Sequence, residues 1–210
     1  MPKDMPTLVD FAKMLKSVVA AHGFVRASST WRRDTGEFVD IIEYQRGGPQ
    51  YTLNIGVLTK SAYKVAWGTD APQRPHADDC TVEDRIKNLF LQASDLSVPM
   101  TDEMRAKRRQ WWELSDPKSH AEIIGLIEQS VLPFFEQMHS RRAQIDYLRR
   151  GIGGAAHWLA PMSIEILRYE CGEHLEACAN LRNYKGKGKY ATYPDERANA
   201  IADRLNCLKL

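Results

Sequence analysis

The N-terminal part of the chain carries the apolar pattern of an amphipathic helix. Between residues 7 and 22, apolar residues recur at steps of three and four, the period that gives a helix one buried stripe. The stripe consists of Leu8, Phe11, Leu15 and Val19. Gly23 follows directly and predicts the end of the helix, because glycine adopts the left-handed backbone that often closes one.

Short runs rich in aromatic and β-branched residues follow, over residues 30–33, 38–45 and 51–58. Asp34-Thr35-Gly36 and Gly47-Gly48-Pro49 separate these runs and have the composition of turns. The spacing predicts an antiparallel meander, and we interpret residues 63–67 as an extension of it.

Apolar and polar side chains alternate along residues 51–58, so the two faces of this strand differ. The apolar set, which predicts a core face beneath the first helix, consists of Leu53, Ile55 and Val57. The opposite set consists of Thr52, Asn54 and Gly56. Because these side chains are small or polar, the second face leaves room for a ligand or partner.

The middle of the chain is less regular. Residues 68–79 predict a polar loop, and residues 80–91 suit either a helix or a strand. A short strand is expected over residues 110–114, after which Asp116 and Pro117 predict a helix start. Apolar residues continue this helix to Met138, and the proline within it, Pro133, is expected to bend it.

After residue 140 the pattern becomes purely helical, with short helices starting near Pro161, after Gly172 and near Pro194. We therefore predict an α+β protein in which an antiparallel β-meander sheet packs against helices. The α+β domain spans residues 1–140, and a C-terminal helical subdomain, a hairpin or three-helix unit, spans residues 141–210.

Composition places these patterns in a globular chain. Of its 210 residues, 43% are hydrophobic and 27% are charged, which is enough apolar surface for a folded core. A net charge of +2 excludes a dedicated nucleic-acid coat protein, although basic residues are in excess after residue 140. No uncharged stretch reaches the ~20 apolar residues of a membrane span, and no secretory signal pattern opens the chain. We expect a cytoplasmic protein.

The cysteines lack a CxxC pair and dense spacing, which favours reduced thiols over a disulfide framework. Cys171, His174 and Cys178 recur on one face of a predicted helix, and His76 or Cys80 would complete a tetrahedral zinc site. Zinc motifs usually begin with a tight cysteine pair, which is missing here. The sequence therefore predicts neither a metal nor a cofactor.

Catalytic motifs are equally weak. Asp40 and Glu43 superficially offer the carboxylates of a nuclease, but they point to opposite faces of one strand and do not converge. No nucleophile elbow, phosphate-binding loop or HExxH motif occurs, and the lysines of residues 185–189 lack phosphate-loop spacing. With the arginine pairs at 141–142 and 149–150 these lysines offer only a weak polyanion surface, so specific nucleic-acid binding is not expected.

Several segments in order resemble the bacterial family known as domain of unknown function 4304, over roughly residues 8–140. They are the helix end HGF, the strands FVDIIEYQR and YTLNIGVL, Asp79-Cys80 followed by Arg85-Ile86, the pair Trp111-Trp112, and VLPFFEQM. The resemblance implies a compact bacterial α+β domain without an agreed activity. Residues 90–110 depart from the family pattern as an insertion or a lengthened helix.

The polar face of the predicted sheet is the best candidate site. Its proposed binding residues combine amide, guanidinium and indole groups, which orient a ligand or peptide by hydrogen bonding and stacking. They are Gln45, Asn54, Arg85, Trp111 and Trp112. We interpret the protein as a non-catalytic protein- or ligand-binding module of an immunity-like or adaptor kind. The alternative is a small hydrolase or nucleic-acid-processing enzyme whose residues come from distant segments.

Overall fold

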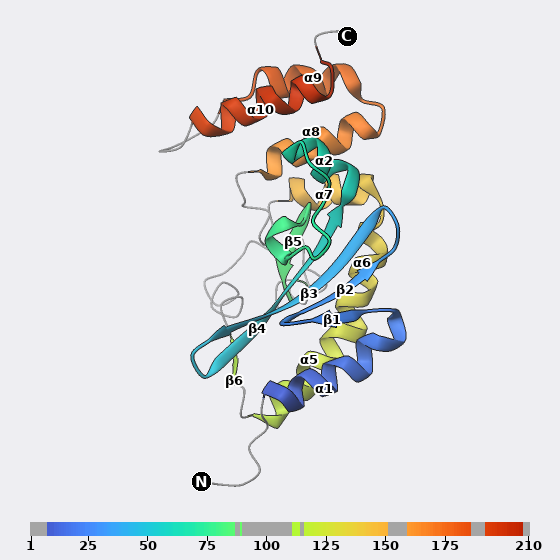
Figure 1. Ribbon diagram of the computed structural model, residues 1–210, viewed down its shortest axis with the longest axis vertical. Coiled ribbons are helices and arrows are strands. Elements are labelled where there is room, and N and C mark those ends of the chain that lie inside the picture. The colour runs from blue at the N-terminus through green and yellow to red at the C-terminus, as the bar shows by residue number, and fades with distance from the viewer. Residues whose placement is uncertain are drawn as a thin grey trace.

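The computed structural model describes residues 8–86, 89, 111–113, 116–150, 159–185 and 192–207. The sheet has six antiparallel strands, five of them in the order β1-β2-β3-β4-β5 (Figure 1). The sixth strand, β6, pairs with the start of β4, along the same edge of β4 as β5. The strands are β1 (Val25–Ala27), β2 (Thr30–Asp34), β3 (Phe38–Gly47), β4 (Gln50–Thr59), β5 (Val82–Arg85) and β6 (Trp112–Glu113). The predicted meander and the α+β class are confirmed.

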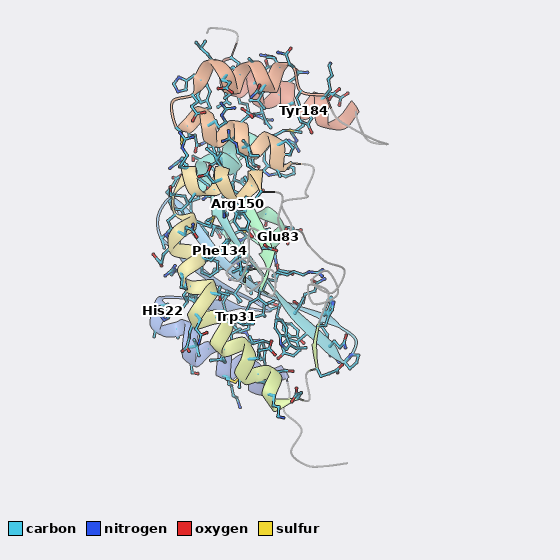
Figure 2. The ribbon with its side chains drawn as sticks, turned by 180° about the vertical axis from the view of Figure 1, so that it is seen from behind. His22, Trp31, Glu83, Phe134, Arg150 and Tyr184 are labelled. Atoms are coloured by element: carbon cyan, nitrogen blue, oxygen red, sulfur yellow. A yellow bond between two sulfur atoms is a disulfide. The ribbon has the colours of Figure 1, made fainter. Side chains whose placement is uncertain are left out.

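Helices cover one face of the sheet, as Figures 1 and 2 show from opposite sides. They are α1 (Leu8–Val19) with the 3-10 turn η1 (Ala20–His22), α5 (Pro117–Leu126) and α6 (Leu132–Met138). The stripe residues Phe11 and Leu15 of α1 are fully buried, as is Leu53 on β4. Gly23 ends the first helix with a φ of 83°, which confirms the predicted stop.

The helix start at Asp116 is also confirmed. The Asp116 carboxylate accepts a hydrogen bond from the Lys118 amide at 3.0 Å, and Pro117 occupies the first turn. A π-helical turn, η3 (Ile127–Val131), joins α5 to α6 directly before Pro133. The helix is therefore widened just before the proline, which lacks the N–H of a regular helical hydrogen bond, and the predicted bend stays a prediction.

The prediction for residues 63–67 is wrong, because they belong to helix α2 (Lys60–Trp67). The alternation of Tyr63, Val65 and Trp67 imitates a strand, but the buried side chains are Ala62 and Ala66, one helical turn apart. The ambiguous segment 80–91 contains strand β5, in which Val82 and Asp84 point inward.

Helix α7 (Arg141–Arg149) packs against β5, where the Tyr147 hydroxyl donates to Asp84. Helices α8 (Ala160–Glu170), α9 (His174–Arg182) and α10 (Thr192–Arg204) lie beyond this end of the sheet (Figure 1). The sequence did not predict α7, whose charged residues hide an apolar face of Ile145, Tyr147 and Leu148. From α10, Arg197 and Arg204 donate to carbonyls at the C-terminal end of α2. The tail is thereby bonded to the sheet domain.

The cysteine prediction is wrong for one pair. Cys178 on α9 and Cys207 after α10 form a disulfide, although they are 29 positions apart in the sequence. Cys80 and Cys171 are free thiols. Sequence spacing could not reveal the pair because the antiparallel arrangement of α9 and α10 brings its members together.

Apolar residues of α1, of the helix-side positions of the sheet and of α5 to α10 belong to one continuous core. Among the described residues, no helix combines the length and the apolar character needed to cross a membrane.

Candidate binding face

The sheet surface turned away from α1 and α5, called the loop face below, is covered at one end by residues 69–80. The 3-10 turn η2 (Ala77–Asp79) lies there, and Ala77 packs on Val39, Ile41 and Leu58 in a small second core. At this end, the space predicted beside the polar positions of β4 is therefore filled.

Glu43 fastens this covering segment to the sheet. Its carboxylate accepts hydrogen bonds from the Ala77 amide at 2.9 Å and from Thr30 at 3.3 Å, and it lies 2.6 Å from His76 Nδ1. Burial alone would raise the pKa of Glu43, but the hydrogen bonds of Ala77 and His76 hold that pKa below its ordinary value. The ionised carboxylate is thus part of the fold.

Gly56 on β4 explains how closely the segment approaches. A Cβ at this position would lie 2.5 Å from Cys80 Sγ, so only glycine leaves room for the thiol. Burial and nearby carboxylates raise the pKa of Cys80 well above its ordinary value. Cys80 is therefore a protonated packing residue.

At the other end of the loop face, the structure brings together Gln45, Asn54, Arg85 and Trp111. The Asn54 amide donates to Gln45 Oε1 at 3.2 Å, and Asn54 lies directly opposite Arg85 in the β4–β5 ladder. The Arg85 guanidinium lies 5.5 Å from the centroid of the Trp111 ring. Gln45 is exposed, and the other three side chains are half-buried. We call these four residues the polar set.

Trp112, the fifth predicted binding residue, lies on the opposite face. It pairs with Tyr51 across β4 and β6, and its ring is buried 6.3 Å from the Tyr51 ring, between centroids. Adjacent strand residues point to opposite faces, so only one of the two tryptophans joins the polar set.

A groove of about 980 Å³ opens on the loop face between the β1–β2 hairpin, the start of α2 and residues 70–75. Sequence reasoning missed it, because its walls come from three separate segments. The available signal was weak: Arg32 and Val39 fall on the same face as Asn54, and a proline-containing loop follows the strands.

Every carboxylate that lines the groove already has a cationic partner. The pairs are Lys60 with Asp34 at 2.9 Å, Lys64 with Asp70 at 2.9 Å, and Arg141 with Glu37 at 2.9 Å. Both lysines of the groove are therefore paired with its aspartates, and Glu37 is paired with Arg141 from outside the groove.

Arg32 and Arg74 are different, because neither forms an ion pair within the described part of the chain. Arg32 donates from Nε to the Pro75 carbonyl at 2.6 Å, which holds the loop against β2. Burial lowers the pKa of Arg32, nearby Glu43 opposes this, and the Arg74 guanidinium lowers the pKa further. Arg32 Nη2 also donates to the Arg74 carbonyl at 3.4 Å, so the two arginines adjoin at the groove wall.

Residues 15–137, more than half of the chain, match a family described as a domain of unknown function (DUF4304). The chain belongs to this family. The match ends within α6, so the groove and the polar set lie inside the DUF4304 domain, and α7 to α10 follow it. No match was found among the curated proteins or among the solved structures. The predicted departure at residues 90–110 lies outside the described residues.

On the helix side of the DUF4304 domain, Asp40 is the residue whose surroundings most resemble those of a catalytic carboxylate. It is fully buried and lies 2.8 Å from His139 Nε2 and 2.7 Å from Arg33 Nε. Burial raises the pKa of Asp40, and the contacts of its carboxylate with His139 and Arg33 oppose this. Glu43 is on the opposite face, as expected, so the two carboxylates do not share a metal.

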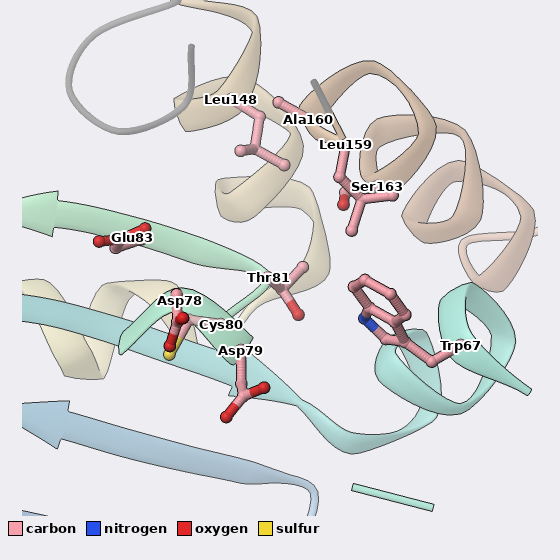
Figure 3. A pocket seen from close by; sticks show the side chains of 10 residues that line it. All are labelled: Trp67, Asp78, Asp79, Cys80, Thr81, Glu83, Leu148, Leu159, Ala160 and Ser163. Atoms are coloured by element: carbon pink, nitrogen blue, oxygen red, sulfur yellow. The ribbon is translucent and has the colours of Figure 1, made fainter. Parts of the chain in front are cut away.

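A small crevice lies between β5, α2 and α8, lined by Trp67, Asp78, Glu83 and Ser163 among others (Figure 3). Its free volume of about 30 Å³ suits a water molecule, not a substrate. Burial and the neighbouring Asp78 raise the pKa of Glu83. The crevice is a packing seam between the DUF4304 domain and its helical tail.

The zinc set considered from the sequence is not assembled. Cys178 is bonded to Cys207, Cys171 is exposed, and His174 stacks on Tyr169 with centroids 4.3 Å apart. Among the described residues, no group of three potential metal ligands gathers anywhere.

Proposed function

We propose that the chain is a non-catalytic binding module whose partner docks on the loop face. The observation that carries this proposal is the 980 Å³ groove, a volume at the upper end of ligand sites, which are about 300–1,000 Å³. Strands β1, β2 and β3 supply part of the groove wall, and a site built on strands is held more precisely than one built on loops alone.

The chemistry of the described residues supports binding over catalysis. The Cys80 thiol is protonated, and Asp40 is buried between a histidine and an arginine that its carboxylate helps to fix. The ring of His139 stacks on Phe38 with centroids 5.0 Å apart, an arrangement that restrains it as a packing group.

The polar set forms the second part of the proposed surface. Its amide pair and its stacked arginine and tryptophan are held in place by contacts with each other, so they lose little freedom when a partner binds. Arg and Trp are also the residue types that most often anchor protein interfaces.

We place this module in the bacterial cytoplasm, as an immunity-like or adaptor protein. The Cys178–Cys207 disulfide is unusual for that compartment, where thiols are kept reduced. Rapid thiol alkylation of intact cells followed by mass spectrometry should find both cysteines alkylated there. Recovery of the pair as a disulfide would instead indicate an oxidising compartment.

Site-specific photo-crosslinking in the native cell tests the docking face. A benzophenone side chain at Gln73, on the groove lip, and at Gln45, in the polar set, should capture one common partner. The same group at Lys16, exposed on α1 behind the sheet, is the matched control and should not capture the partner found from Gln73 and Gln45. Equal capture from Lys16, or none from Gln73 and Gln45, would contradict the proposal.

A further inference from the structure

The structure points to the chemical class of the partner, an inference that rests on the proposed function. We propose that the groove on the loop face binds an extended acidic segment of a partner protein. Its aspartate or glutamate side chains would pair with Arg32 and Arg74, and its apolar side chains would lie on the groove floor.

Charge is the first argument. The carboxylates of the groove are already paired, so Arg32 and Arg74 remain as two cationic groups without an ionic partner among the described residues. A carboxylate between these adjoining arginines would form charge-assisted hydrogen bonds with both. Arg26 also borders the groove, but its guanidinium lies over the Trp31 ring, 5.1 Å from the centroid.

The floor of the groove supplies the second argument. Val25 of β1 is 73% exposed in this depression, beside the half-buried Ala71 and the buried Val39. Exposed apolar side chains rimmed by arginine are typical of protein interfaces, whose centres are apolar and rich in arginine. A small inorganic anion would leave Val25 in water.

The position of the groove favours an extended segment. Strand β1 is at the end of the strand order, so its outer edge lies beside the groove. A peptide laid along such an edge continues the ladder, and its alternate side chains point to one face. No aromatic residue lines the groove within the described chain, whereas single-stranded nucleic acids are usually held by stacking on such residues.

The test uses the whole chain and two short synthetic peptides. One peptide alternates glutamate with valine, and the other alternates glutamine with valine. Titrations followed by amide NMR shifts should show the acidic peptide moving the signals of Val25, Ala27 and Ala71. The glutamine peptide should bind far more weakly. A titration with pyrophosphate and one with a single-stranded oligonucleotide complete the set.

Arg74→Gln removes one anchor at an exposed position, so folding should be unaffected. It should raise the Kd of the acidic peptide by about tenfold or more, the loss of one charge-assisted contact. Arg46→Gln is the matched control, because it removes the same charge from the exposed end of β3, far from the groove. Its Kd should equal that of the unaltered chain.

The inference fails if the glutamine peptide binds as tightly, if the two variants behave alike, or if the shifts map away from the groove. It also fails if pyrophosphate or the oligonucleotide reproduces the same shifts with equal affinity. If the acidic peptide does not bind but Gln73 and Gln45 crosslink to a common partner, the proposed docking face stands and its partner has a different charge. Missing crosslinks would instead count against the proposed function itself.

Discussion

In the oxidised protein, the disulfide between Cys178 and Cys207 should be a major source of stability for the helical tail. Replacing both residues with serine releases a loop whose ends are 29 residues apart. The chain-entropy relation for a loop of this length gives a loss of about 3.6 kcal/mol in the free energy of unfolding at room temperature. The perturbation acts mainly on the unfolded chain, because the link restricts that state more than the folded one.

Urea unfolding followed by circular dichroism measures this loss directly. The double variant should unfold at a lower urea concentration, and chemical reduction of the unaltered chain should reproduce the same shift. Cys171→Ser is the matched control, since Cys171 is a free and exposed thiol, and its midpoint should not move.

Two results would refute this reasoning. A double variant as stable as the unaltered oxidised chain would show that the cross-link contributes nothing beyond the packing of α9 on α10. If the double variant is also less stable than the unaltered chain under reducing conditions, the loss comes from the serine side chains and not from the missing cross-link.

Further predictions concern the sheet, the loop anchor and the tail. Asn54→Ala and Arg85→Ala should each lower the free energy of unfolding, measured by thermal unfolding, by less than about 1 kcal/mol. Leu53→Ala, in the core, should lower it by about 2–5 kcal/mol. Equal losses would show that the polar set is structural. Glu43→Gln should cost about 1–3 kcal/mol at neutral pH. The lowered pKa of Glu43 means that its stabilisation is present above the pKa of an unfolded glutamate, about 4.3, and is lost as the pH falls through the folded-state pKa. The variant should therefore show a flatter acid limb in a pH series of melting curves, and an unchanged limb would contradict the role of this carboxylate. Gly68→Ala should lower the free energy of unfolding by about 1–2 kcal/mol, because the φ of Gly68 is +77° and a Cβ would lie 2.9 Å from Arg204 Nε. Gly125→Ala in α5 is the control and should not lower it, because no atom lies within 4 Å of the added Cβ.

Much of the sheet could be predicted because its side-chain period is short and local. Leu53, Ile55 and Val57 all proved fully buried, as the alternation along β4 indicated. The same reasoning failed at residues 63–67, where aromatic alternation concealed a helix whose buried contacts are two alanines. Local pattern is insufficient where small residues make the contact.

The candidate site was harder to predict, because a site depends on register between distant segments. Alternation placed Asn54 on the second face, but it could not show which of Trp111 and Trp112 shares that face. The groove joins Val25, Lys64 and Arg74 through the β1–β2 hairpin and the Glu43 anchor, none of which has a sequence signature.

Amide hydrogen exchange, measured on the chain alone and in complex with the partner captured from Gln73, tests the docking face most directly. Docking on the loop face should slow exchange of the amides of β1 and of residues 70–75 and leave exchange unchanged in α1 and in α8 to α10. Protection of α1 or the tail helices, with β1 exchanging as fast as in the free chain, would contradict it.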